Sequence, residues 1–461
     1  MKIKILVIAA LTFLSVQGIA QKETPPSGGE PKNFNLPEKT TFELGNGLSV
    51  TLVQYGTIPK ATIQAVVKTG NIHENSDQVW LADLMGDLMA EGNVTDEGVD
   101  LNDALAKMGG ELNVAVRRNT TTISADVLAE FTDDFVKLLA KTIMTPAFPE
   151  SEVARLKNDL KRQVNVSKTR PQSQANESFQ KLIYPEHPYG RVFPTEEMID
   201  SYDLETIKAF YNDNFGAKRT HVYVSGVFDE SQVKSAIETA FADWKEGTTT
   251  EYDVPEVAEA ASIEVLDRPG APQSTIYFGL PVIDPSDDDY IPLMVTDALL
   301  GGSFGSRITA NIREDKGYTY SPRSVISDGY RSSVWREQAD VTTEFTGATL
   351  NEIVKEIRTL QNEPPPKEEL DGIKNYMAGL FVLRNSTRGG IIAQLAFLDE
   401  HDLPESFLTE RVKKIYEVTP EKVNEVMKEY IRPEDMTLVV VGDRSVIDSQ
   451  LDEFKSTIDN L

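Results

Sequence analysis

The chain has 461 residues, 40% of them hydrophobic, with no cysteine and a formal net charge of −27. This length exceeds that of one ordinary domain, so we expect two or more hydrophobic cores. The strong negative charge excludes binding to nucleic acid or to an anionic membrane surface. The absence of cysteine excludes disulfide bonds and a lipid-modified cysteine anchor.

Residues 1–20 predict a secretory signal peptide. Lys2 and Lys4 give a basic start, residues 5–16 are apolar, and Gly18-Ile19-Ala20 is a small-residue cleavage site. An uncleaved membrane anchor is the alternative, but the apolar run is too short to cross a bilayer comfortably. We therefore expect an exported bacterial protein, periplasmic or secreted, with no membrane anchor after cleavage. Residues 21–36, rich in Pro, Gly and Ser, predict a flexible leader.

Strand and helix patterns alternate after the leader. A hairpin is predicted around the turn Gly45-Asn46-Gly47, and alternating apolar residues predict strands at 61–68 and 120–127. Apolar residues at helical spacing predict helices at 78–91, 101–108, 130–144 and 149–166.

The chain then repeats itself. The corresponding residues are Pro149 and Pro366, Lys157 and Lys374, Asn158 and Asn375, and Gly226 and Gly442. The repeat predicts two homologous halves of α+β class, each a largely antiparallel sheet with helices on one face. We place the halves at residues 37–245 and 262–461, joined by a polar, strand-poor linker at 246–261.

A glycine-rich turn precedes an arginine and a tyrosine in the second half. An apolar helical pattern through residues 291–299 stops at Gly301 and Gly302, and a second helix then carries Arg313. Lys316 and Gly317 end that helix, and residues 318–321 predict the start of a strand. Arg313 and Tyr320 therefore lie seven residues apart across a turn from helix to strand.

This stretch resembles the C-terminal motif of the M16 (insulinase and pitrilysin-like) zinc peptidases, and is most similar to their bacterial M16B members. The resemblance covers nearly everything after the signal peptide, including residues 187–190 and 268–273. It implies that the halves face each other around a chamber for unfolded peptide. It also implies that Arg313 and Tyr320 contact the substrate backbone, with the tyrosine hydroxyl reaching the scissile carbonyl. A phenol and a permanently charged guanidinium suit that task.

The same resemblance locates the family's inverted zinc motif, His-x-x-Glu-His, on the predicted helix at 81–92. Asp83 and Asp87 stand in the place of the histidines, Gly86 in the place of the general base, and Gln163 in the place of a further Glu ligand. Two carboxylates without an imidazole make a poor zinc site, and a hard cation needs more oxygen ligands. We therefore expect no metal in this chain and a solvated face at Asp83 and Asp87.

Two features around the zinc motif leave alternatives open. Gly86 is costly inside a helix, which indicates either relaxed selection or close packing. The four histidines, His73, His187, His221 and His401, include no two at ligand spacing, so no second zinc motif is visible.

The glycine-rich turn has two interpretations. Gly301, Gly302, Ser303 and Gly305 can expose backbone N–H groups that hold a peptide carboxylate or peptide backbone. The same residues fit the serine-hydrolase pattern G-x-S-x-G with Ser303 as nucleophile. That pattern requires a preceding strand, whereas a helix is predicted here, so we favour backbone binding.

A second binding element is predicted in the first half. In the family, the strand after a Gly-Gly turn offers an edge to which substrate adds as an extra strand. Here Gly109 and Gly110 precede a strand in which Asn113 and Ala115 hold the typical positions. Edge pairing uses main-chain hydrogen bonds, so it would bind peptide with little sequence preference. A plain sheet edge is an equally good and compatible interpretation.

The leading hypothesis is a zinc-free subunit of an exported heterodimeric M16B peptidase. Its partner would be an M16B subunit with the intact motif, and that partner would bind the zinc. Arg313 and Tyr320 would then act on unfolded peptide in trans, and the chain alone would hydrolyse nothing through zinc. The alternative is a non-enzymatic peptide-binding or scaffold protein, as with the core subunits of the respiratory bc1 complex, which also resemble M16 proteins. The presence of Arg313 and Tyr320 favours the first hypothesis.

Overall fold

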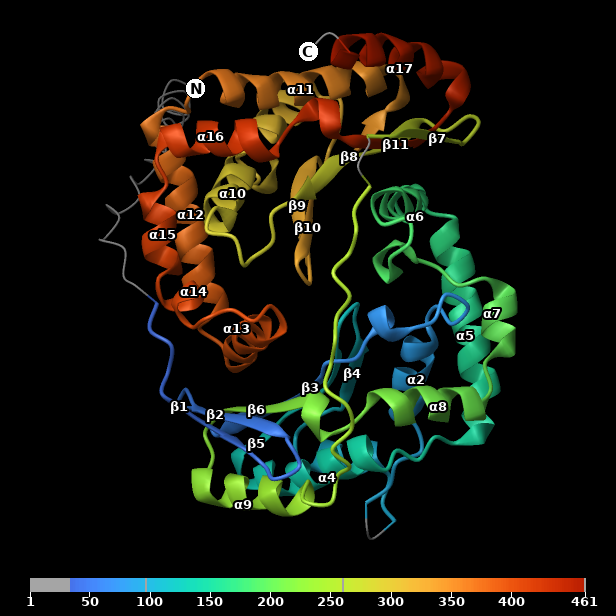
Figure 1. Cartoon of the computed structure of the whole chain (residues 1–461), viewed down its shortest axis with the longest axis vertical. Helices are drawn as coiled ribbons and strands as arrows, with labels where there is room; N and C mark the ends of the chain where they lie inside the picture. Colours follow the sequence, from blue (N-terminus) through green and yellow to red (C-terminus); the bar gives the residue numbers. More distant parts are fainter. Residues whose placement is uncertain (1–33, 96–97, 259–260, 460–461) are drawn as a thin grey trace, which may run out of the picture. The chain divides into compact units, whose positions relative to one another are not determined.

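The computed structural model describes residues 34–95, 98–258 and 261–459 of the chain. The predicted signal peptide and most of the predicted leader lie outside these residues. Among the helices of the described part, none has the length and apolarity needed to cross a membrane. The described chain forms two β-sheets, one from each half of the sequence (Figure 1). This α+β organisation confirms the fold that the internal repeat predicts.

The first sheet has six strands in the order β1-β2-β6-β3-β5-β4. These strands are β1 (Lys39–Glu43), β2 (Ser49–Gln54), β3 (Lys60–Val67), β4 (Asn113–Val116), β5 (Thr121–Leu128) and β6 (Thr220–Gly226). β2 and β6 run parallel, and the other neighbouring strands are antiparallel. The predicted hairpin between β1 and β2 turns at Gly47, where a φ of 87° suits a residue without Cβ. β4 is the last strand of the sheet and pairs only with β5 on its inner side.

The second sheet repeats this plan with five strands in the order β7-β11-β8-β10-β9. The strands are β7 (Ile263–Asp267), β8 (Gln273–Val282), β9 (Arg323–Gly329), β10 (Ser332–Thr342) and β11 (Thr437–Gly442). β11 is parallel to β7 and antiparallel to β8, as β6 is parallel to β2 and antiparallel to β3. β9 is therefore the counterpart of the edge strand β4.

Helices cover the sheets and connect their strands. In the first half they are α2 (Leu81–Met89), α3 (Leu101–Lys107), α4 (Thr132–Met144), α5 (Glu150–Lys168), α6 (Pro171–Ile183), α7 (Glu196–Ser201), α8 (Leu204–Asn214) and α9 (Glu230–Ala240). In the second half they are α10 (Tyr290–Asp297), α11 (Thr346–Asn362), α12 (Lys367–Arg384), α13 (Arg388–Glu400), α14 (Ser406–Thr409), α15 (Arg411–Glu417), α16 (Pro420–Tyr430) and α17 (Arg444–Asp459). α4 and α9 pack side by side in the first half (Figure 1).

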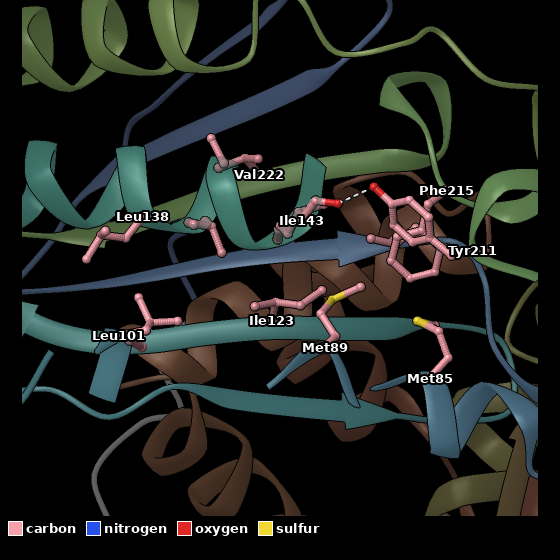
Figure 2. Close-up of a cluster of buried hydrophobic side chains, with 14 of the residues drawn as sticks. Met85, Met89, Leu101, Ile123, Leu138, Ile143, Tyr211, Phe215 and Val222 are labelled. Atoms are coloured by element: carbon pink, nitrogen blue, oxygen red, sulfur yellow. Dashed lines mark hydrogen bonds between the residues drawn. The ribbon is translucent and has the colours of Figure 1, made fainter. Parts of the chain in front are cut away.

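The core of the first half lies between its sheet and its own helices. Alternate residues of a strand point to one face, so Ile63 and Ala65 of β3 and Ile123 of β5 all enter this core. Figure 2 shows Ile123 among Met85 and Met89 of α2, with the Tyr211 hydroxyl donating a 2.5 Å hydrogen bond to the Ile143 carbonyl. A buried phenol needs such a partner because an unpaired O–H costs free energy in an apolar core.

Each sheet's opposite face is covered in part by a helix from the other half of the sequence. Ile391, Ile392 and Leu395 of α13 pack with Val53, Val66 and Tyr223 of the first sheet. In the same way α6 packs on β8 and β11 of the second sheet. The strand residues in both clusters alternate with those of the main cores, so α6 and α13 lie on the faces that the halves' own helices leave uncovered.

The structure differs from the sequence expectation at two boundaries. Residues 318–321 do not begin a strand, because β9 starts at Arg323 and Thr319 makes only an isolated bridge to Val341. The predicted leader ends earlier than residue 36, since Phe34 packs on Phe381 with ring centroids 5.3 Å apart. An apolar residue at the end of a polar segment was the signal for this contact.

Candidate functional site

Helix α2, the family's zinc helix by resemblance, is packed directly against strand β4. A Cβ added to Gly86 would lie 2.7 Å from Cγ2 of Val116 and 3.5 Å from Cγ1 of Val114. Contacts under about 3 Å between carbon atoms are repulsive, so only glycine fits here without movement. Close packing therefore explains Gly86, and a glutamate in its place has no room.

Asp83 and Asp87 lie in different environments on α2. Asp83 is partly buried, and its Oδ2 accepts a 2.6 Å hydrogen bond from the Asn71 amide. Burial raises the pKa of Asp83 above its ordinary value. Asp87 is exposed, and withdrawal from water together with the nearby Asp83 carboxylate raises its pKa to about 6. The expected solvated face is thus correct for Asp87 and wrong for Asp83.

Gln163 lies on α5, which packs against α2, but its side chain is exposed. The α5 residue that interacts with this region is Arg155, whose guanidinium bonds Glu91 at 2.5 Å, Glu152 at 2.6 Å and Asp159 at 3.3 Å. A single arginine thus joins carboxylates of α5 to Glu91, which follows α2, and such exposed pairs contribute little stability.

A buried carboxyl group at the start of α2 escaped the sequence analysis. Glu74 accepts hydrogen bonds from the backbone N–H groups of Trp80, at 3.1 Å, and Ala82, at 2.8 Å. Burial, which outweighs these hydrogen bonds, raises the pKa of Glu74 to about 8. Its spacing from the helix start gave no recognisable capping signature, so only the structure reveals its contact with the helix N-terminus.

These residues do not fit a zinc ion. Across the described residues there is no group of three or more His, Cys, Asp or Glu that could hold a metal. His221 bonds Thr51 at 2.8 Å, and His187 caps the turn at Tyr189, so both rings have structural roles. His401 is buried at the end of α13 against Phe397. The chemistry of this half offers neither an imidazole pair nor a general base.

The glycine-rich turn of the second half lies at a change of helical geometry. α10 continues as a π-helical turn over Ala298–Gly302, and a second π-helical segment covers Thr309–Asp315. Between them Gly302 and Gly305 are exposed, whereas Ser303 is buried and its hydroxyl has no hydrogen-bond partner in the described part of the chain. Ser303 therefore lacks the histidine base that a serine hydrolase requires.

Arg313 lies between two exposed aromatic rings. Its guanidinium carbon is 4.6 Å from the ring centre of Phe304 and 4.8 Å from that of Tyr320. The rings of Phe304 and Tyr320 are 71% and 77% exposed, which is unusual for such large apolar groups. We call these three residues the Arg313 stack. It brings together Arg313 and Tyr320, which lie seven residues apart in the sequence.

The two ring contacts hold the Arg313 side chain in place and leave its terminal N–H groups unbonded. Nε of Arg313 lies 3.1 Å from Glu314 Oε1, while the two terminal nitrogens have no hydrogen-bond partner among the described residues. Stacking on both faces restrains the guanidinium and leaves its fork of N–H groups to meet an oxygen acceptor. Phe304 was missed by the sequence analysis, although an aromatic residue between glycines was a usable signal.

Asn113 and Ala115 lie on the edge strand β4 and alternate with Val114 and Val116, which face α2. Asn113 is exposed and lines a cavity of about 1470 Å³, whereas Ala115 does not line it. Residues 386–389, at the start of α13, form another wall of the cavity. No hydrogen bond or ion pair between described residues joins this edge to the Arg313 stack, so the predicted site residues form two separate groups.

Comparison with protein families gives two matches along the chain. Residues 50–193 match the description "Insulinase (Peptidase family M16)". Residues 201–377 match "Peptidase M16 inactive domain". Together the two matches cover most of the chain: the first lies within the first half, and the second runs from the end of the first half into the second half.

Individual relatives agree with these matches. "Uncharacterized zinc protease YmxG" of Bacillus subtilis is 24% identical over 347 residues, which are 73% of this chain and 82% of that protein. "Non-peptidase homolog YmxG" of Helicobacter pylori is 22% identical over 391 residues, 84% of this chain and 90% of that protein.

A solved structure agrees with the fold. The crystal structure of a peptidase M16 inactive domain from Pseudomonas fluorescens has a TM-score of 0.80 at 22% identity and covers 88% of this chain and 98% of that one. The likeness extends over both sheets and their helices. The chain therefore belongs to the M16 (insulinase-like) peptidase family.

Proposed function

We propose that this chain is the zinc-free subunit of an exported heterodimeric M16B metallopeptidase. In this proposal a partner M16B subunit with an intact His-x-x-Glu-His motif carries zinc, and Arg313 and Tyr320 of this chain contact the peptide that the partner cleaves. The observation that carries the proposal is the Arg313 stack: a charged, restrained and exposed group with free donors and no structural partner that explains it.

The donors of the stack suit a peptide backbone. The terminal N–H groups of Arg313 can bind a carbonyl oxygen, and the exposed Tyr320 hydroxyl can donate to the negative charge that develops on a scissile carbonyl. The nearby exposed backbone at Gly302 and Gly305 adds room for close approach of a peptide.

The edge of β4 supplies a second contact in this proposal. Its outer main-chain groups are open to pairing with an extended peptide, which would bind with little sequence preference. Asn113 lies at the rim of the large cavity beside this edge, so side chains of a bound peptide have space there.

The alternative function is a non-enzymatic binding or scaffold protein of M16 fold. The packing of Val116 against Gly86 favours it, because the space for a general base in this chain is filled. It leaves the Arg313 stack unexplained, since a scaffold has no use for two exposed aromatic rings beside a guanidinium whose terminal nitrogens make no hydrogen bond in the described part of the chain. We therefore rank it second.

The test is a pull-down of the tagged mature chain from its native envelope extract. Zinc content and peptidase activity are measured on the recovered complex and on the chain alone. We expect zinc and activity only in the complex, with an M16 partner present, and a fall in activity of about tenfold or more for Arg313→Ala and for Tyr320→Phe.

Arg444→Ala and Tyr376→Phe are the matched controls, because both residues are exposed and belong to other surfaces. They should leave activity unchanged. Recovery of an intact complex whose activity ignores Arg313 and Tyr320 would favour the scaffold function.

A further inference from the structure

Two carboxyl groups lie directly beneath the bend at Gly301 and Gly302. Asp297 ends helix α10 and is partly buried, and Glu337 lies on β10 with no exposed surface. Neither residue belongs to an ion pair in the described chain. Such burial of charge is costly unless the groups are neutral or paired.

The side-chain hydrogen-bond donors around this pair bond to a single oxygen of Asp297. The indole N–H of Trp335 donates to Asp297 Oδ1 at 2.7 Å, and the Ser324 hydroxyl donates to the same atom. Both oxygens of Glu337 are buried and have no hydrogen-bond partner among the described residues. A carboxylate ion in this position would have lost its water and gained no side-chain hydrogen bond in return.

The two glycines rest on these carboxyl groups. A Cβ at Gly301 would lie 2.7 Å from Glu337 Oε2 and 2.6 Å from Ser324 Oγ, and a Cβ at Gly302 would overlap the Asp297 carboxyl group. The two carboxyl groups therefore support the bend, and a change in their separation displaces the backbone that packs on them.

The charges that face Glu337 do not compensate for its burial. Burial raises its pKa well above the ordinary range, and the Asp297 carboxylate on α10 raises it further. Opposing these effects, the Arg323 guanidinium on β9 and the backbone N–H groups of Arg323 and Gln338 favour the charged form. Burial likewise raises the pKa of Asp297 to about 6.

A metal cation is a poor alternative occupant. Hard cations take six or more oxygen ligands, whereas this pair offers two carboxyl groups in tightly packed surroundings. The described residues also contain no group of three acids or histidines that could hold a metal. A proton on Glu337 removes the buried charge without any further ligand.

We propose that Glu337 carries a proton at neutral pH beside the Asp297 carboxyl group, and that this proton holds the Gly301–Gly302 bend, and with it the loop of Phe304, in position. Asp297 and Glu337 are thus positioning residues of the glycine-rich turn. Removal of the proton to solvent leaves two anions in a dry pocket, where they repel each other and displace the bend. The consequence for peptide binding rests on the proposed function, but the protonation of Glu337 itself does not.

The first experiment uses the isolated mature chain, so it does not depend on a partner or on peptidase activity. Urea midpoints are measured from about pH 5 to about pH 9 for the wild-type chain, Glu337→Gln, and the exposed control Glu344→Gln. An acid whose pKa is raised by folding stabilises fully below its unfolded value, and this stabilisation is lost as pH rises through the folded value. The wild-type and control midpoints should therefore fall with pH more than the Glu337→Gln midpoint.

Hydrogen exchange gives the local readout. After correction for intrinsic rates, protection of residues 299–306 should fall about tenfold between about pH 6 and pH 9 in the wild-type chain. Glu337→Gln, which keeps a neutral side chain of the same shape, should retain that protection across the range. A merely structural role would leave the pH profiles of the two proteins parallel.

A spectroscopic measurement keeps the proposal testable if Glu337→Gln folds poorly. Infrared difference spectra of wild type and Asp297→Asn near neutral pH should show a protonated carboxyl band in the wild type that shifts when its neighbour is replaced. Parallel pH profiles, the absence of a protonated carboxyl band at neutral pH, or a stoichiometric metal ion that is lost in Glu337→Gln would each overturn the proposal.

Discussion

The two halves of this protein share one plan, but they differ around Gly86 of α2 and around the glycine-rich turn after α10. In the first half, α2 and β4 are pressed together until a valine methyl group occupies the space above Gly86. In the second half, the turn after α10 lies equally close to β9, because a Cβ on Gly301 would lie 2.6 Å from Ser324 Oγ, but the loop that follows displays Phe304 to solvent. Both glycines are thus crowded, and the second region also exposes a large aromatic side chain.

This difference concerns how the space beside each glycine is used. At Gly86 a neighbouring side chain fills the space, so a larger residue no longer fits there. The exposed rings of Phe304 and Tyr320 beside Arg313 have no such packing role. The following predictions test whether the space beside Gly86 is filled and whether the Arg313 stack is available to bind peptide.

The largest effect is expected from restoring the family residues in α2. The triple variant Asp83→His, Gly86→Glu, Asp87→His should be destabilised by about 3 kcal/mol or more, because a buried glutamate must displace Val116 and lose its water. Urea unfolding measures the change.

Two simpler variants separate crowding from helix propensity. Gly86→Ala should still destabilise, whereas Gly379→Ala in α12, with nothing within 4 Å of its Cβ, should stabilise by up to about 1 kcal/mol. If Val116→Ala fails to relieve Gly86→Ala, the crowding explanation is wrong.

The next effect concerns Glu74 at the start of α2. Glu74→Ala should cost about 2 kcal/mol, since two backbone N–H groups lose their acceptor. Because burial raises the pKa of Glu74 from 4.5 to about 8, its contribution is complete below about pH 4.5 and is lost as pH rises toward 8.

Glu74→Gln supplies the neutral comparison. Its urea midpoint should fall less than that of the wild type between about pH 5 and pH 8. Equal falls for both proteins would mean that Glu74 is charged in the folded state.

A smaller and more local effect is expected within the glycine-rich turn. Gly301→Ala should cost about 1–3 kcal/mol, because its Cβ would collide with Ser324 and Glu337. Gly305→Ala, whose Cβ meets nothing within 4 Å, should change stability by less than about 0.5 kcal/mol. Thermal or urea unfolding of the two variants measures the difference. Equal costs would show that Ser324 and Glu337 do not crowd Gly301.

The smallest stability effect is expected at the Arg313 stack itself. Arg313→Ala and Tyr320→Phe should each change the free energy of unfolding by less than about 0.5 kcal/mol, since both side chains lie at the surface. Activity of the recovered complex should nevertheless fall, and Arg313→Lys should restore little of it because lysine lacks the planar fork. A large loss of stability would instead identify the stack as a structural element.

The sequence predicted the fold because its signals are local and repeated. Alternating strands, amphipathic helices and the recurrence of Gly226 as Gly442 each depend on short-range physics, and the two sheets follow from them. The changed zinc positions were equally visible, since zinc demands particular residue types at particular spacings.

Contacts between distant segments were beyond the sequence. Gly86 is crowded by Val116, and Gly301 is crowded by Glu337. In each case the neighbour lies on another element. The strand expected at residues 318–321 was also wrong, because a pattern of alternating tyrosines does not reveal whether a partner strand is available there. Phe304 was the exception, a residue whose exposure could have been suspected from its glycine neighbours.

Helix α6 packs on the sheet of the second half and α13 on the sheet of the first half, and this arrangement has a consequence for biosynthesis. The strands of the first sheet are complete once Gly226 has left the ribosome, but α13 begins only at Arg388. Until then Val53, Val66 and Tyr223 lack their covering helix. A nascent chain with such an apolar face is a substrate for chaperones and a nucleus for aggregation, so translation speed and chaperone supply should govern the yield of this protein.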